Sequence, residues 1–205
     1  HEWRWPNEEL PTPAVDYPQP VWDGSSLEGQ TIFLYSEQGL GDAIQFVRYV
    51  PLVLERGGRV ILGCERPIER LFSRIQGVEK IVTPQSELPS FTCHASLLSL
   101  PRIFGTRLET IPSQVPYLRS EETLSKEWAR RLGDGPGLKV GIVWRGNPAQ
   151  KVNPMRSCPV ALLEPLARIP GIRLFSLQKD PGEEGIPSGV TDLADDLNDF
   201  TDTAA

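Results

Sequence analysis

Short apolar segments that alternate with helical patterns constrain the fold of this chain more than any other feature. "TIFLYS" (31–36), "RVILGCE" (59–65) and "KIVT" (80–83) are short runs rich in β-branched, aromatic or other apolar residues, which is typical of buried strands. Helical patterns over residues 43–58 and 67–75 separate them. Because strand and helix alternate at short spacing, we expect an α/β fold with a parallel sheet covered by helices.

A second unit is predicted after "GDGPG" (133–137), the strongest internal break in the pattern. A helix over 121–132 precedes this break, and "LKVGIVW" (138–144) restarts the alternation as a buried strand. A helix near 159–168 and a strand over 172–178 follow. We therefore expect one domain over 29–136 and the first part of another over 137–205.

Residues 1–28 are expected to lie outside these domains. The prolines between residues 6 and 24 stand among polar residues, and this composition predicts an extended linker instead of a packed element. The chain starts without methionine and stops in "DFTDTAA", so we expect a piece of a longer protein with an incomplete second domain.

Composition excludes several classes of protein. The formal net charge of −6 and a sequence pI of about 5.1 leave no basic surface of the kind that nucleic acids require. Cys64, Cys93 and Cys158 are an odd number at wide spacing, which argues against a disulfide framework and against a structural zinc site. The sequence has no apolar run of membrane-spanning length, so we predict no transmembrane segment, no metal site and a cytoplasmic location.

The loop after the first predicted strand, "SEQGLGD", carries two carboxylates and two glycines. Gly39 and Gly41 either supply positive φ angles or let the backbone approach a ligand. The loop lacks the three-glycine dinucleotide fingerprint, and no Gly-Lys-Ser/Thr follows it. Asp42 either caps the following helix or acts as a general base, and Glu37 is either a second functional acid or a solvated loop residue.

Two other candidate sites, His94 and the loop after residue 144, each have a structural as well as a functional interpretation. His94 is either a structural histidine or part of a site. The loop "WRGNPAQKVNPMRS" joins a predicted strand to a predicted helix, a suitable place for a diphosphate, although it could also be an ordinary basic loop. Its polar candidates are Arg145, Asn147, Lys151 and Arg156.

Several of these segments together resemble a known family. "EQGLGDAIQFVRYVPLV", "FTCHASLLSLPRIFGT", "VGIVWRGNP" and "FSLQK", in this order, resemble the glycosyltransferase-like domain that is joined to tetratricopeptide (TPR) repeats in many bacterial proteins. That domain is similar to the heptosyltransferase family, glycosyltransferase family 9. "HEWRWP" resembles the end of the last repeat, so the resemblance covers nearly the whole chain. Thr92 and Ser96 stand where relatives commonly have aspartate and proline, and Gln150 and Asn153 where histidine and aspartate are usual.

The resemblance implies a GT-B fold, in which one Rossmann-like domain holds the acceptor and a second holds a nucleotide-sugar donor. It implies no metal and no cofactor besides the donor substrate. Asp42 corresponds to the catalytic base. The acceptor side would be lined by Glu37, Gln38, Gly39, Gly41 and His94. Arg156, or else Lys151, would hold the donor phosphates together with Arg145 and Asn147.

The function expected from this resemblance is inverting, metal-independent transfer of a sugar to a hydroxyl group of a saccharide, a lipid-linked saccharide or a protein. The expected location is the cytoplasm, with the inner face of the membrane as a further option. One alternative is a non-catalytic scaffold whose upstream repeats bind a protein partner, and another is a GT-B epimerase. We expect the 205-residue chain alone to be inactive.

Overall fold

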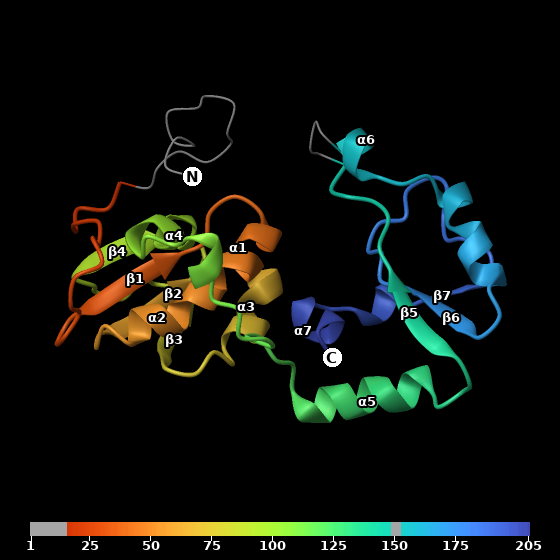
Figure 1. Cartoon of the computed structure of the whole chain (residues 1–205), viewed down its shortest axis with the longest axis horizontal. Helices are drawn as coiled ribbons and strands as arrows, with labels where there is room; N and C mark the ends of the chain where they lie inside the picture. Colours follow the sequence, from red (N-terminus) through yellow and green to blue (C-terminus); the bar gives the residue numbers. More distant parts are fainter. Residues whose placement is uncertain (1–15, 149–152) are drawn as a thin grey trace. The chain divides into compact units, whose positions relative to one another are not determined.

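The computed structural model describes residues 16–148 and 153–205 (Figure 1). The chain divides into two compact units, of which the first ends at Arg119 and the second begins at Ser120.

The first unit is built on a four-stranded parallel sheet. Its strands are β1 (Thr31–Tyr35), β2 (Arg59–Gly63), β3 (Val78–Val82) and β4 (Cys93–Ser96), in the order β3-β2-β1-β4. Every residue of β1 is buried, as expected for a central strand that is covered on both faces. The strand order is that of the first part of a Rossmann fold. The predicted parallel sheet is confirmed, but β4 was not predicted as a strand.

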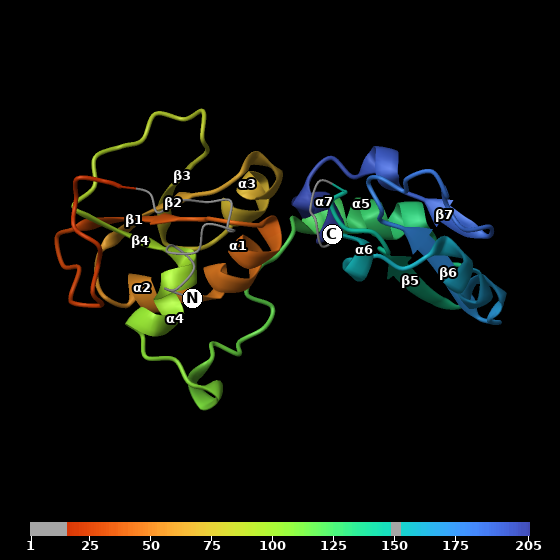
Figure 2. The same cartoon turned by 90° about the horizontal axis from the view of Figure 1, so that it is seen from above.

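Helices and turns connect these strands. They are α1 (Leu40–Phe46), η2 (Val47–Tyr49), α2 (Val50–Leu54), α3 (Arg66–Phe72), η3 (Leu97–Ser99), α4 (Leu100–Ile103) and η4 (Leu108–Thr110). The helix predicted over 43–58 begins earlier, at Leu40. The η2 turn divides it into α1 and α2, and Pro51 lies in the first turn of α2. Proline has no N–H to donate to the preceding turn, which explains the interruption. Figure 2 shows the segment that carries η4 extending away from the sheet beyond α4.

The described part of the predicted linker packs against the first sheet. Val21 forms a parallel bridge with His94, and Trp22 N donates to the carbonyl of His94 at 2.8 Å. Trp22 is only 4% exposed, and the ring of Tyr17 lies 5.5 Å from that of Phe33. The interpretation as an unpacked linker is therefore wrong for residues 16–24, while residues 6–15 lie outside the described part. Proline keeps the backbone extended, and an extended backbone can also pair with a sheet edge.

The second unit contains a separate parallel sheet, as predicted, and this sheet has three strands. Its strands are β5 (Leu138–Ile142), β6 (Ile172–Ser176) and β7 (Val190–Asp192), in that order. The prediction of a buried strand over 138–144 is wrong, because the strand spans only 138–142 and every residue in it is exposed or half-buried. The remaining elements are α5 (Glu122–Leu132), α6 (Asn153–Arg156), η5 (Val160–Leu162), η6 (Glu164–Arg168), η7 (Ala194–Asp196) and α7 (Phe200–Thr203). The helix predicted near 159–168 is wrong, because two 3₁₀ segments occupy this stretch. Pro165, in the middle of this stretch, lacks the N–H that a continuous helix would use.

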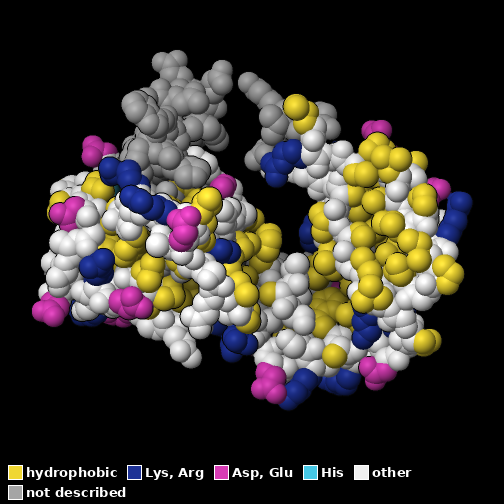
Figure 3. All heavy atoms as spheres, viewed as in Figure 1, with side chains coloured by type: hydrophobic (Ala, Val, Ile, Leu, Met, Phe, Trp, Pro, Cys, Tyr) yellow, Lys and Arg dark blue, Asp and Glu magenta, His cyan; other side chains and the backbone are white. Residues whose placement is uncertain are grey.

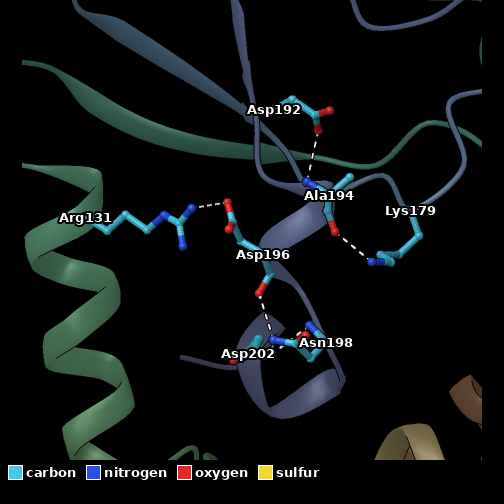
Figure 4. A network of polar contacts seen from close by, with 7 residues as sticks. All are labelled: Arg131, Lys179, Asp192, Ala194, Asp196, Asn198 and Asp202. Atoms are coloured by element: carbon cyan, nitrogen blue, oxygen red, sulfur yellow. Dashed lines mark hydrogen bonds and ion pairs between the residues drawn. The ribbon is translucent and has the colours of Figure 1, made fainter.

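Helix α5 packs within the second unit. Trp128 forms a buried cluster with Phe175, Leu193 and Leu197. Arg131 forms an ion pair with Asp196 (Figure 4). The structure thus places the division before α5, whereas the sequence analysis placed it after residue 136. The glycines of residues 133–137 end the helix, but they do not determine the domain boundary. The apolar side of α5 packs on the second sheet, so the helix belongs to the second unit.

A polar network joins the elements that follow β6 (Figure 4). Lys179 Nζ donates to the carbonyls of Ala194 and Leu197 at 2.6 and 2.8 Å. Asn198 N donates to Asp202 Oδ2 at 2.8 Å. Burial works to raise the pKa of Asp202, but hydrogen bonds from Asn198, Asp199 and Trp128 outweigh it and leave this pKa below its ordinary value.

The fold class predicted from the sequence is confirmed: the chain is an α/β protein with parallel sheets. Figure 3 shows hydrophobic side chains gathered on one face of the second unit. The exposed large apolar residues of that unit are Leu138, Val143, Met155, Leu162, Leu166 and Ile169. No helix in the described ranges is long and apolar enough to cross a membrane.

Candidate functional site

The carboxyl ends of β1 and β4 form the point of the first sheet where the strand order reverses. The chain leaves β1 toward β2 on one side, while β4 lies on the other side. Ligands of open parallel sheets bind outside the carboxyl ends of the strands at such a point. The loop that begins with Glu37 therefore has the position expected of a binding loop.

Glu37 and Ser96 form a buried pair at this point. Ser96 Oγ donates a hydrogen bond to Glu37 Oε1 and accepts one from Leu98 N at 3.2 Å. Glu37 is 6% exposed and Ser96 is 2% exposed. The alternative of a solvated loop residue is thus wrong for Glu37. Ser96 was noted in the sequence only as a departure from the family pattern, and its partnership with Glu37 was missed.

Asp42 is a partly buried residue in the first turn of α1. Its Oδ2 accepts a hydrogen bond from Gly39 N at 3.1 Å. This contact satisfies a backbone donor at the start of the helix, so the geometry supports the capping role.

The loop conformation does not depend on positive φ angles at Gly39 and Gly41. Gly39 has φ −92°, and Gly41 lies inside α1. The residue with positive φ is Gln38, at 64°, a conformation that is uncommon outside glycine. A Cβ atom at Gly39 would lie 3.1 Å from Asp42 Oδ2. Gly39 therefore leaves room for the Asp42 carboxylate.

His94 lies in an aromatic cluster instead of beside Glu37. Its ring centroid lies 5.0 Å from that of Tyr17 and 5.9 Å from that of Tyr35. The residue is 3% exposed, and Nδ1 has no hydrogen-bond partner within the described residues. Burial lowers the pKa of His94, and the Gln19 backbone and the Asp16 charge offset part of this effect. These contacts favour the structural alternative for His94.

The lowered pKa of His94 predicts that the first unit loses stability in acid. The unfolded chain binds a proton with a pKa of about 6.5, whereas the folded state binds it only at lower pH. This contribution to the free energy of unfolding is complete above about pH 6.5 and is lost as pH falls from there through the folded pKa. Urea unfolding at neutral and mildly acidic pH should show this loss.

The matched variant His94→Phe keeps an aromatic ring but has no proton to bind. It should lose less stability between the two pH values than the unmodified protein does. Equal losses in both proteins would show that His94 does not cause the pH dependence.

Thr92 lies at the opposite end of the sheet from the Glu37–Ser96 pair. Thr31 N donates to Thr92 Oγ1 at 3.2 Å, and Thr92 Oγ1 donates to the Thr31 carbonyl at 3.0 Å. This residue joins the amino ends of β1 and β4. Thr92 therefore has a structural role in this sheet.

The loop after β5 in the second unit is fixed at its base. Trp144 N and Arg145 N donate to Gln178 Oε1 at 3.1 and 2.9 Å. Cys158 N donates to the Trp144 carbonyl at 2.8 Å. A cavity of about 690 Å³ adjoins this base. It is lined by Trp144, Arg145, Ser157, Cys158, Pro159, Val160, Asp180, Pro181, Gly182, Glu183 and Glu184.

Of the four predicted donor-phosphate residues, the structure places Arg145 at this cavity. Arg145 NH1 lies 4.0 Å from Asp180 Oδ1. Asn147 and Arg156 are exposed and are not part of the lining. Lys151 lies outside the described residues. Of the described members of the predicted group, only Arg145 therefore lines the cavity.

Acidic residues that the sequence analysis missed also line this cavity. Glu184 Oε2 accepts a hydrogen bond from Val160 N at 2.9 Å. Asp180 and Glu183 add two more carboxyl groups. The segment "KDPGEEG" directly follows a predicted strand, and this position at the carboxyl edge was the signal that could have identified it.

The residues described by the structure contain no group of three His, Cys, Asp or Glu side chains that could hold a metal ion.

Cys64 is buried, and burial raises the pKa of its thiol to about 12.

These two parallel-sheet units, with polar loops at their carboxyl edges, define a Rossmann-like class of protein. No family model matches the chain. Protein FlbA of Caulobacter vibrioides is 25% identical to this chain, and the match covers 91% of this chain and 37% of that protein. The chain thus spans little more than a third of the length of this curated relative. The solved structure of the iron-containing dodecameric glycosyltransferase TibC from enterotoxigenic E. coli H10407 is similar over 91% of this chain and 51% of its own, with 16% identity and a TM-score of 0.49.

Proposed function

We propose that the protein containing this chain transfers a sugar from a nucleotide-sugar donor to a hydroxyl acceptor with inversion at the anomeric carbon. The observation that carries this proposal is the pair of acidic residues, Glu37 and Asp42, in the loop at the reversal point of the first sheet. A carboxylate there can take the proton of an acceptor hydroxyl. The family resemblance of the surrounding segment supports the same reaction.

Asp42 is the proposed general base. As the acceptor oxygen forms a bond to the anomeric carbon, the bond from that carbon to the diphosphate breaks and Asp42 receives the hydroxyl proton. Glu37 has a positioning role, because Ser96 holds its buried carboxyl group beside the loop. In this proposal Gln38, Gly39 and Gly41 form the backbone that faces the acceptor, and His94 supports the sheet behind them.

Arg145 is the proposed contact for the donor diphosphate. It lines the cavity in the second unit, and a guanidinium group can bind two phosphate oxygens at once. Arg156, Asn147 and Lys151 are proposed as further contacts. Positive charge at this place would stabilise the leaving diphosphate without a metal ion.

Replacing Arg145 with glutamine should weaken binding of a nucleoside diphosphate to the full-length protein by roughly tenfold or more, because a charge-assisted hydrogen bond is lost. A screen of nucleotide sugars for thermal stabilisation identifies the nucleotide, and calorimetry then gives the two affinities. Arg168→Gln is the matched control, since Arg168 is exposed in the same unit and does not line the cavity. Equal affinities in the Arg145→Gln and Arg168→Gln proteins would reject this role.

A non-catalytic scaffold is the second candidate, and the acidic cavity favours it. Asp180, Glu183 and Glu184 line the cavity together with Arg145, so carboxylates outnumber the cation among its described lining. Negative charges disfavour a bound diphosphate. If no nucleotide sugar stabilises the full-length protein, the scaffold is the better interpretation.

A further inference from the structure

A second cavity lies in the first unit, where Gln45 and Phe46 of its lining follow Asp42 by one turn of α1. Its volume is about 410 Å³. One side comes from the end of α1 and from η2, and the other from α4 and the segment that follows it. The lining consists of Gln45, Phe46, Arg48, Tyr49, Pro101, Thr106, Arg107, Leu108 and Ile111.

The charges around this cavity differ from those of the chain as a whole. The chain has a formal net charge of −6, yet the described lining contains two arginines and no acidic side chain. The other cavity, beside Arg145, is lined by three carboxyl groups. An anion is therefore the ligand that this second cavity suits.

The contacts of Arg48 show that its charge is fixed in the wall of this cavity. Its Nε atom is buried and has no hydrogen-bond acceptor within residues 16–148 and 153–205. The guanidinium group is held in place, because NH1 donates to the Pro112 carbonyl at 3.4 Å and the group lies 4.5 Å from the ring centroid of Tyr117. Buried donors of a charged group normally have acceptors. The Nε atom itself is out of reach of solvent, so an oxyanion in the cavity would contact another part of this fixed guanidinium group and balance its charge.

The apolar part of the lining indicates what the anion is attached to. Phe46 and Tyr49 are buried beside Arg48, whereas Leu108 is 84% exposed and Ile111 is 40% exposed. A free inorganic anion would leave these apolar side chains in water. A ligand with an apolar group next to its charge would cover them.

We propose that this cavity binds a phosphate or carboxylate group that carries an apolar chain, with Arg48 and Arg107 holding the oxyanion and Leu108 and Ile111 contacting the chain. The inference does not depend on the proposed glycosyl transfer, because none of these residues belongs to the proposed catalytic or donor-binding set. Its test uses binding alone.

The probe is hexyl phosphate, measured by calorimetry or by NMR titration against the full-length protein. It should bind more tightly than inorganic phosphate and more tightly than hexanol. Arg107→Gln should weaken hexyl phosphate binding roughly tenfold or more through loss of a charged contact. Leu108→Ser should weaken hexyl phosphate binding but leave inorganic phosphate binding unchanged.

Arg74→Gln is the matched control, since Arg74 is an exposed arginine of the same unit outside the cavity. Equal affinities of the Arg107→Gln and Arg74→Gln proteins for hexyl phosphate, or equal binding of hexanol and hexyl phosphate, would overturn the proposal. Arg107 is exposed, so its variant tests the site without removing a buried side chain.

A vesicle experiment then identifies the source of the anion. If the ligand is a lipid headgroup, phosphatidylcholine vesicles that contain phosphatidic acid should bind the unmodified protein. The same vesicles should not bind the Arg107→Gln protein. Binding of hexyl phosphate without binding of the vesicles assigns a soluble amphiphilic anion instead.

Discussion

Replacing Asp42 with asparagine is expected to lower the turnover of the full-length protein by about 10²–10⁴-fold, the usual contribution of a general base. The fold should stay intact, because the asparagine carbonyl oxygen can still accept the hydrogen bond from Gly39 N. Asparagine cannot, however, take up the proton of the acceptor hydroxyl. Turnover is measured with the nucleotide sugar that the thermal screen identifies, together with its acceptor.

Asp42→Ala separates the capping role from the catalytic role. Loss of the cap should lower the free energy of unfolding by about 0.5–2 kcal/mol, whereas Asp42→Asn should keep most of it. If Asp42→Asn keeps normal turnover and Asp42→Ala only lowers stability, Asp42 is a cap and the proposed mechanism is wrong. Donor binding should be nearly the same in both variants.

Replacing Trp22 with alanine should lower the free energy of unfolding of the first unit by about 3–5 kcal/mol, as for other buried aromatic side chains. Trp22 is 4% exposed, and its ring centroid lies 5.7 Å from that of Phe104. Its Nε1 atom donates to the Ser25 carbonyl at 3.1 Å. Urea unfolding followed by circular dichroism measures the change.

Val21→Ala is the control for this experiment, because Val21 is the neighbouring residue and is 61% exposed. It should change the free energy of unfolding by no more than about 0.5 kcal/mol. Equal stability of the two variants would mean that residues 16–24 are a linker in solution after all.

The strands that the sequence predicted are those that carry a run of mostly apolar side chains. β1 and β2 are buried in the middle of the first sheet, so nearly every position is apolar. β4 reads "CHAS", and β7 has only three residues, "VTD". Such segments form strands because a neighbouring strand pairs with them, and a local pattern cannot show that pairing.

The candidate site was predictable where its residues are neighbours in the chain. Glu37, Gly39 and Asp42 lie within one loop and the helix start that follows it, and the structure joins Gly39 to Asp42 by a hydrogen bond. The partner of Glu37, however, is 59 residues away on another strand. Glu184 and Val160 are likewise joined only by the fold. Contacts of this kind depend on topology, which residue spacing does not reveal.

The docked segment before β1 also has a consequence for the association of this protein with other chains. An uncovered edge strand presents free backbone groups to which further strands can add. β3, at one edge of the sheet, carries the exposed charged residues Glu79 and Lys80, and such charges discourage strand addition. β4, at the other edge, has no Asp, Glu, Lys or Arg, and the backbone of Pro20 and Trp22 occupies the backbone N–H and C=O of His94. The same residues that complete the core therefore protect the sheet from aggregation through this edge.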